Sequence, residues 1–181
     1  MAPELPSIAS GLDPKDLLGE FEQMRKQKGF SLIELLIVVA IILIIAAIAI
    51  PNLLRSRIAA NEASAVGSTR TINTAEVTFA STYPNHGFAS LTHLGPPSSG
   101  SVADTGAGLL DSVLAAGTKS GYVFTVATGG APSGGGAATT YSVNGDPQNS
   151  QTGQRHFFSD QSGVIRFNVS GTASTSDSPL Q

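Results

Sequence analysis

The chain has 181 residues, a length that suits one modest domain and suffices to bury a core. Charged residues make up 13% of it, about half of the roughly 25% typical of soluble domains, and the formal net charge is −3. The lack of cysteine excludes disulfides, thiolate metal sites and cysteine nucleophiles. The slight acidic excess argues against a nucleic-acid binder, which usually has a basic face.

Residues 1–29 carry five acidic and four basic side chains, and they end in a basic cluster that consists of Arg25, Lys26 and Lys28. A long apolar run follows this cluster. Basic residues beside a membrane segment stay on the cytoplasmic side. We therefore expect this end of the chain to be cytoplasmic and the residues after Pro51 to be extracytoplasmic.

The apolar run is long enough to cross a membrane. From Leu35 to Ile50, sixteen consecutive side chains lack a polar atom, and the run reaches back to Phe30 with only Ser31 and Glu34 interrupting it. As a helix it would be roughly 30 Å long, which matches the hydrocarbon core of a bilayer. The pattern predicts a membrane-spanning helix over residues 30–51.

Two other interpretations of the apolar run remain open. A core helix would need apolar neighbours on every side, which a single small domain rarely supplies. A secretory signal peptide would be cut near Ala47-Ile48-Ala49. The long acidic segment before the basic cluster and the carboxylate of Glu34 within the run both argue against a simple export signal.

Glu34 is a carboxylate inside the expected membrane segment. An ionised carboxylate in hydrocarbon costs several kcal/mol, so such a residue is by default functional and has a partner. No Lys, Arg or His lies between Glu34 and Arg55, so the partner must come from elsewhere. An amino group created by proteolysis just upstream is one candidate. The alternative is a carboxylate that simply reaches the nearby membrane edge.

The stretch from Lys26 to Glu34, which reads KQKGFSLIE, closely resembles the processing site of type IV prepilins, and the likeness extends to Arg57. The resemblance implies that prepilin peptidase cuts between Gly29 and Phe30 and methylates the new amino group of Phe30. It also implies that Glu34 attracts the N-terminal amine of a neighbouring subunit during assembly. Opposite charges in a low-dielectric medium interact strongly, so this pair would set the register of adjacent helices.

Pro51 ends the apolar run and lacks the amide hydrogen of a regular helical residue, so we expect it to kink or locally melt the helix. In type IV pilins, a proline near this place marks a bend. No glycine lies between Gly29 and Gly67 to add to that effect. The other interpretation is that Pro51 begins a second helix.

Residues 52–83 are predicted to form the amphipathic half of the same long helix, which ends at the breakers of residues 83–87. Apolar side chains recur every seven residues and should pack on the chain's own sheet, while charged side chains supply the polar part. The apolar positions are Ile58, Ala65, Ile72 and Phe79, and the charged ones are Arg55, Arg57, Glu62, Arg70 and Glu76.

The remaining residues predict a small antiparallel sheet. Residues 84–120 are expected to be a connecting loop region with one or two helical turns at 109–116. Residues 121–169 should form three or four strands interrupted by a flexible glycine-rich loop at 129–138, and residues 170–181 a flexible tail. The expected fold class is α+β, with a long N-terminal helix packed on an antiparallel sheet, as in pilins.

No catalytic or metal constellation is expected, and no cofactor. The three histidines lie far apart in the sequence, at His86, His93 and His156. Asp146 and Asp160 flank loops and form a weaker alternative, a calcium site, although the acids lack the spacing of a known calcium loop. The triplet at residues 168–170 has the form of a glycosylation signal, without the preceding acid that bacterial enzymes usually require.

The sequence therefore favours a non-enzymatic structural subunit of a type IV pilus-like filament that serves adhesion, twitching motility or DNA uptake. The implied partners are further copies of the chain, prepilin peptidase, and an inner-membrane assembly platform with its ATPase. The precursor would lie in the inner membrane and the assembled filament on the cell surface. The alternatives are a pseudopilin of a type II secretion system and a signal-anchored or secreted binding domain that does not polymerise.

Overall fold

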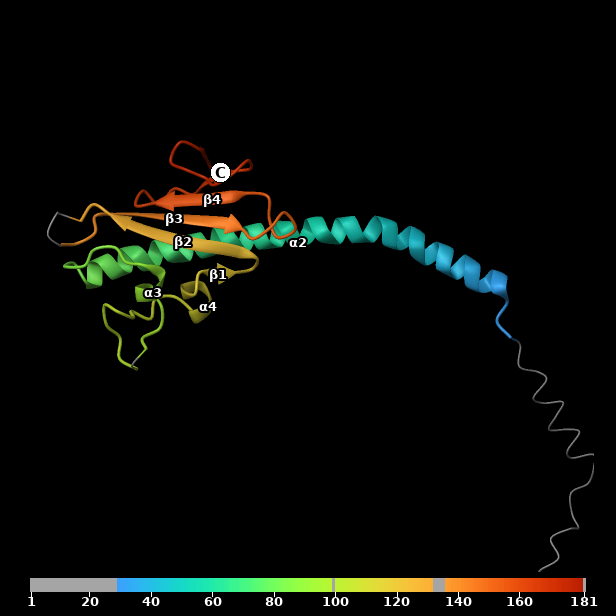
Figure 1. Cartoon of the computed structure of the whole chain (residues 1–181), viewed down its shortest axis with the longest axis horizontal. Coiled ribbons are helices and arrows are strands. Elements are labelled where there is room, and N and C mark those ends of the chain that lie inside the picture. Colours follow the sequence, from blue (N-terminus) through green and yellow to red (C-terminus); the bar gives the residue numbers. More distant parts are fainter. Residues whose placement is uncertain (1–28, 99, 132–135, 181) are drawn as a thin grey trace, which may run out of the picture. The chain divides into compact units, whose positions relative to one another are not determined.

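The computed structural model describes residues 29–98, 100–131 and 136–180 (Figure 1). A long helix is followed by two short helices and a sheet, which confirms the predicted α+β class. The helices are α2 (Leu32–Thr82), α3 (Leu91–Leu94) and α4 (Ser112–Ala115). The strands are β1 (Thr118–Lys119), β2 (Tyr122–Gly129), β3 (Thr140–Pro147), β4 (His156–Asp160), β5 (Arg166–Asn168) and β6 (Ser178–Pro179).

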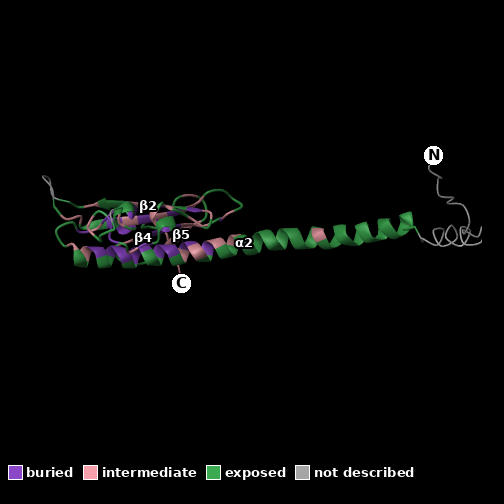
Figure 2. Cartoon of the chain, turned by 90° about the horizontal axis from the view of Figure 1, so that it is seen from below, coloured by how far each residue is buried: buried purple, intermediate pink, exposed green. Residues whose placement is uncertain are grey.

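The chain forms two units, one ending at Ile48 and one running from Ala49 to Gln181, and α2 contributes to both. In the first unit, the part of α2 up to Ile48 has no buried residue (Figure 2). Within the described residues, α2 is the one helix that is long and apolar enough, by length and composition, to cross a membrane. Its apolar side chains are therefore not core residues of this chain, and the core-helix interpretation is wrong.

In the second unit, the C-terminal half of α2 packs its heptad stripe into the core. Ala65, Ile72 and Phe79 are buried there, together with side chains from the strands, and Ile58 is half-buried. The predicted amphipathic helix and its packing on the sheet are thus confirmed. However, Glu62 and Glu76 are also buried, so the prediction that they belong to the helix's polar part is wrong.

The sheet has six strands in the order β1-β2-β3-β4-β5-β6, each antiparallel to its neighbour. The antiparallel arrangement was predicted, but the number of strands was not. The two outer strands contain only two residues each, so they are too short for an alternating apolar pattern to reveal them. The sheet consequently runs beyond the expected 121–169 range at both ends.

The C-terminal tail is held in place rather than loose. Leu180 donates its amide to the Ile165 carbonyl at 2.7 Å, and Ala173 is buried. Asp177 accepts hydrogen bonds from the amide of Ser174 at 2.7 Å and from Asn168 at 2.9 Å. The prediction of a flexible tail rests on composition, which leaves these polar groups to solvent, whereas in the structure they are hydrogen-bonded to the chain.

The segment between α2 and the sheet contributes to the core. Leu91, Leu94 and Leu114 are buried, and both short helices lie within the range expected to be a connecting loop. Asp111 is the N-cap of helix α4, and its carboxylate accepts hydrogen bonds from the amides of Val113 and Leu114, which have no acceptor within the helix. Of the expected glycine-rich loop at 129–138, residues 132–135 lie outside the described residues.

Replacing Phe79 tests the heptad stripe. Phe79 is 1% exposed, so we expect Phe79→Ala to lower the free energy of unfolding by about 3 to 5 kcal/mol, through lost burial and a cavity. Chemical denaturation of the full chain in detergent micelles measures this. The control is Val77→Ala on the same helix, at a side chain that is 58% exposed and should change stability by less than about 0.5 kcal/mol. Equal effects of the two changes would contradict the assigned helix face.

Candidate functional site

The predicted processing site lies at the start of the described residues, just before α2. Gly29 and Phe30 are exposed and lie outside any helix, and Phe30 is 75% exposed. A peptide bond in this setting is open to a protease, because a helix would bury its backbone groups in internal hydrogen bonds. The basic cluster Arg25, Lys26 and Lys28 lies outside the described residues.

Glu34 has a local partner at the beginning of α2. The amide of Ser31, which directly precedes the helix, donates to Glu34 Oε2 at 3.1 Å. A carboxylate in the first turn is favourable because the first amides of a helix have no internal acceptor and carry partial positive charge. The structure therefore shows what the sequence argument missed: Glu34 stabilises the helix start even in a single copy of the chain.

The helical segment after Glu34 presents apolar side chains on all sides, all of them exposed through Ile50 except one half-buried residue. Such a surface is unstable in water and requires lipid or protein around it. Pro51 lies inside α2, whose helical structure runs through it, so it does not begin a separate helix. The expected kink at Pro51 stays a prediction.

Comparisons with known proteins agree with this geometry. Residues 24–50 match the family described as the prokaryotic N-terminal methylation motif. Over 39 residues, the chain is 67% identical to the type IV wide pilus major component PilA4 of the bacterium Thermus thermophilus. The N-terminal segment is thus similar to that of a type IV pilus component. The match covers 22% of this chain and 30% of that relative, and no solved structure matches the chain.

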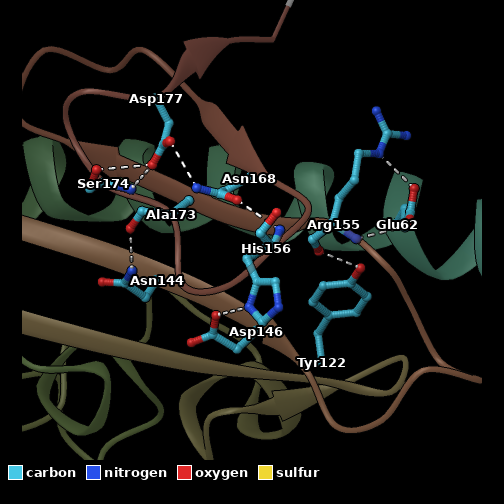
Figure 3. A network of polar contacts seen from close by, with 11 residues as sticks. Glu62, Tyr122, Asn144, Asp146, Arg155, His156, Asn168, Ala173, Ser174 and Asp177 are labelled. Carbon is cyan, nitrogen blue, oxygen red and sulfur yellow. Dashed lines mark hydrogen bonds and ion pairs between the residues drawn. The ribbon is translucent and has the colours of Figure 1, made fainter.

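Beyond this pilin-type segment, the described residues contain a polar cluster at Glu62 (Figure 3). Arg155 Nε lies 2.7 Å from Glu62 Oε2, and the amides of Gln154 and Arg155 donate to Glu62 Oε1 at 3.0 and 3.2 Å. Burial alone would raise the pKa of Glu62, but these hydrogen bonds and the guanidinium outweigh it and hold that pKa below its usual value. The cluster fastens the loop before β4 to α2 of the pilin-like chain.

Glu76 lies on the same face of α2 and is completely buried. Its Oε2 accepts a hydrogen bond from the amide of Ala89 at 2.9 Å. Its Oε1 is buried without a hydrogen-bond partner among the described residues. Burial raises the pKa of Glu76 to about 7, and the hydrogen bond from Ala89 opposes that rise only in part. Glu62 and Glu76 are thus two similar residues with opposite pKa shifts.

The candidate metal residues are not brought together. His156 bonds to Asp146 at 2.5 Å and His86 to Asp104 at 3.2 Å, while His93 lies in α3. Asp160 accepts from the amide of Ser162 in the turn after β4. Asp160 pairs with Ser142 of β3, which is four residues before Asp146 on that strand, so the two aspartates lie apart. Within the described ranges, no group of three His, Asp or Glu side chains could hold a metal ion.

The asparagine of the possible glycosylation triplet already makes hydrogen bonds within the chain. The side-chain amide of Asn168 donates to Asp177 at 2.9 Å (Figure 3), and its side-chain oxygen accepts a hydrogen bond from the amide of Ser170 at 2.8 Å. A glycan acceptor must present this amide nitrogen freely, so the folded chain argues against modification at Asn168.

Sequence reasoning missed the buried roles of Glu62 and Glu76, although a signal was present. Each follows a stripe residue, Ile58 or Ile72, by four positions, and residues four apart lie on the same helix face. Acids in phase with an apolar stripe, rather than opposite to it, indicate carboxylates that face the core.

The pair between Glu62 and Arg155 gives a pH-dependent prediction. Because the pKa of Glu62 is lowered by folding, its stabilisation is present above the unfolded-state pKa and is lost as the pH falls through the folded-state pKa. We expect Glu62→Gln to lower the free energy of unfolding at pH 7 by about 1 to 3 kcal/mol. This deficit should shrink below about pH 4, near the ordinary pKa of glutamate. Denaturation at both pH values measures the deficit, and one that is the same at both would contradict the ion pair.

Proposed function

We propose that the chain is a structural subunit of a type IV pilus-like filament, made as a membrane-anchored precursor and polymerised through its N-terminal helix. The observation that carries this proposal is the exposed apolar half of α2, which lies within the matched methylation motif at residues 24–50. The relative is a type IV pilus component. The proposed partners are further copies of the chain, prepilin peptidase, and an inner-membrane assembly platform with its ATPase.

Processing is proposed to occur between Gly29 and Phe30. Gly29 has no side chain to keep a protease away from the backbone, and among the residues that the structure describes no atom beyond its chain neighbours lies within 4 Å of where a Cβ would be added. The basic cluster before the helix would keep this bond at the cytoplasmic face. Phe30 then carries the new amino group, which the same enzyme would methylate.

Assembly is proposed to exchange lipid for protein around the apolar half of α2. Side chains such as Leu36, Ile41 and Ile44 are each at least half exposed, so a single copy cannot cover them. In a bilayer, lipid surrounds them, and in a filament the same side chains of neighbouring copies would do so. The hydrophobic stabilisation is retained throughout because these side chains do not meet water at any stage.

In this filament, Glu34 would face the amine of Phe30 from a neighbouring copy. The hydrogen bond from Ser31 occupies only Oε2, which leaves Oε1 for that amine. In a low-dielectric setting, an uncompensated charge of either sign is costly, so copies in the wrong register would be disfavoured. Glu34 would thus serve both the start of its own helix and the register of its neighbour.

The processing proposal predicts the mature N-terminus. Mass spectrometry and N-terminal sequencing of the protein purified from cells should find a chain of 152 residues that begins with N-methylated Phe30. An N-terminus at Met1 or at Ile50 would contradict the pilin proposal and favour an uncleaved anchor or a secretory signal peptide. Imaging of sheared surface filaments then distinguishes a pilus subunit from a pseudopilin.

Two substitutions at Glu34 test whether assembly needs its charge. Glu34→Gln keeps an oxygen that can accept from Ser31 but removes the charge, whereas Glu34→Ala removes both. We expect both variants to reduce surface filaments by at least about tenfold, because the interhelical charge pair is worth more than about 1.4 kcal/mol in a low-dielectric setting. Immunoblots of sheared filaments measure this.

The control for these variants is Val39→Leu, an apolar exchange in the same segment, which should leave filaments at the wild-type level. Mass spectrometry of each variant shows whether the leader was removed, so that failed processing is not mistaken for failed assembly. Wild-type filament levels in Glu34→Gln would overturn the charge-register proposal, while the helix-start role would stand.

A further inference from the structure

Glu76 joins α2 to the segment that follows it. Its carboxylate accepts the amide of Ala89, 13 residues further along the chain, at 2.9 Å. Around this bond, the ring of Phe88 lies 4.6 Å from that of Tyr141 on β3, and Leu91 and Leu94 enter the core. The hydrogen bond therefore holds the beginning of a core-forming segment, residues 88–94, against the helix.

The surroundings of Glu76 supply no cation within the described residues. The titratable side chains around it are Glu62 and Arg70 on the same half of α2, Tyr83 and His86 after it, the exposed His93 on α3, Tyr141 and Asp146 on β3, and His156 and Asp160 on β4. Arg70 is exposed, and His86 is 55% exposed and bonds to Asp104. Burial, with the charges of Glu76 and Asp160, raises the pKa of Tyr141 to about 12, so this phenol stays neutral.

The two oxygens of Glu76 differ in a way that makes the ionised form costly. Oε2 has the amide of Ala89, but Oε1 is buried without a partner within the part of the chain that the structure describes. Ionisation strengthens the bond to Ala89, yet it also places a full charge on a carboxylate that water does not reach. The second effect is larger, because one amide hydrogen bond does not replace the hydration of a carboxylate.

We propose that Glu76 is a proton-controlled latch, which in its neutral form holds residues 88–94 on α2 and in its ionised form releases them. Release lets the carboxylate reach water, and the segment then opens locally while the rest of the sheet stays folded. The latch works in one direction, with closure favoured in acid and opening favoured in alkali.

The contrast with Glu62 shows why the latch belongs to Glu76 alone. Both carboxylates lie on one face of α2 and accept backbone amides from a distant segment. Glu62 has the guanidinium of Arg155 beside it at 2.7 Å, so its ionised form is the stable one. A carboxylate with a cation fastens its loop at neutral pH, whereas one without a cation loosens its segment there.

Hydrogen exchange of the full chain in detergent micelles tests the latch. Folding raises the pKa of Glu76 from 4.5 to about 7, so opening should become about 100-fold more favourable between pH 5 and pH 8. The readout is the exchange rate of amides in residues 88–94, divided by the rate in Glu76→Gln at the same pH. This ratio removes the ordinary pH dependence of exchange. Glutamine has the size of glutamate and stays neutral throughout.

Glu62→Gln is the matched control, because it alters a carboxylate on the same helix face without removing the latch, and it should leave the pH dependence at residues 88–94 intact. A ratio that stays constant from pH 5 to pH 8 would overturn the proposal. If Glu76→Gln does not fold, the carboxyl carbon of Glu76 in the wild-type chain can be titrated by NMR. A midpoint near 7 supports the latch, and one below 5 contradicts it.

Discussion

The second unit depends on one constraint: backbone amides that are buried against α2 need hydrogen-bond acceptors. A helix covered by a sheet must bury a stripe of side chains. Loops that cross this stripe bring backbone amides for which no strand offers a hydrogen-bond acceptor. Glu62 and Glu76 provide the acceptors, for Gln154 and Arg155 in one place and for Ala89 in the other. These contacts span 92, 93 and 13 positions in the chain, so the helix organises both distant and nearby segments. The sheet, α3 and the loop before β4 are arranged around a single helix face.

The low charge of the chain has two physical causes that meet on the same helix. Up to Ile50 the helix requires lipid or protein around it, and charges other than Glu34 are absent from it. Beyond Arg70, the exposed face of α2 carries hydroxyl groups instead of charges. Thr71, Thr74 and Thr78 each donate to a carbonyl four residues earlier, so these polar groups are satisfied within the helix itself. On this part of α2, polarity without charge therefore goes with hydroxyl groups whose hydrogen bonds are made within the helix.

How much the sequence predicts depends on whether a signal is local. The apolar run, the processing motif and the heptad stripe lie within short, ordered stretches, and the helix they predict is present from Leu32 to Thr82. The outer strands β1 and β6 have two residues each, and they form strands only because they pair with the edges of β2 and β5. Likewise, the tail is fixed by Asp177, whose partners Ser174 and Asn168 are ordinary surface types in the sequence. Tertiary contacts determine the structure of such segments, and no local sequence pattern predicts them.

The two ends of α2 are subject to different requirements, and this explains why likeness to a known pilus component is confined to 39 residues. In the proposed filament, the segment from Gly29 onward must be recognised by a protease, lie in a bilayer and pack against neighbouring copies. Few sequences meet all three requirements with the same side chains. The second unit needs only to cover one helix face and to present a polar surface, which many sequences achieve. Among those solutions, this chain places one carboxylate beside an arginine and leaves the other without a cation among the described residues. Its two attachments to the helix therefore respond to acid in opposite directions, since protonation weakens the contact at Glu62 and strengthens the hold of Glu76 on its segment.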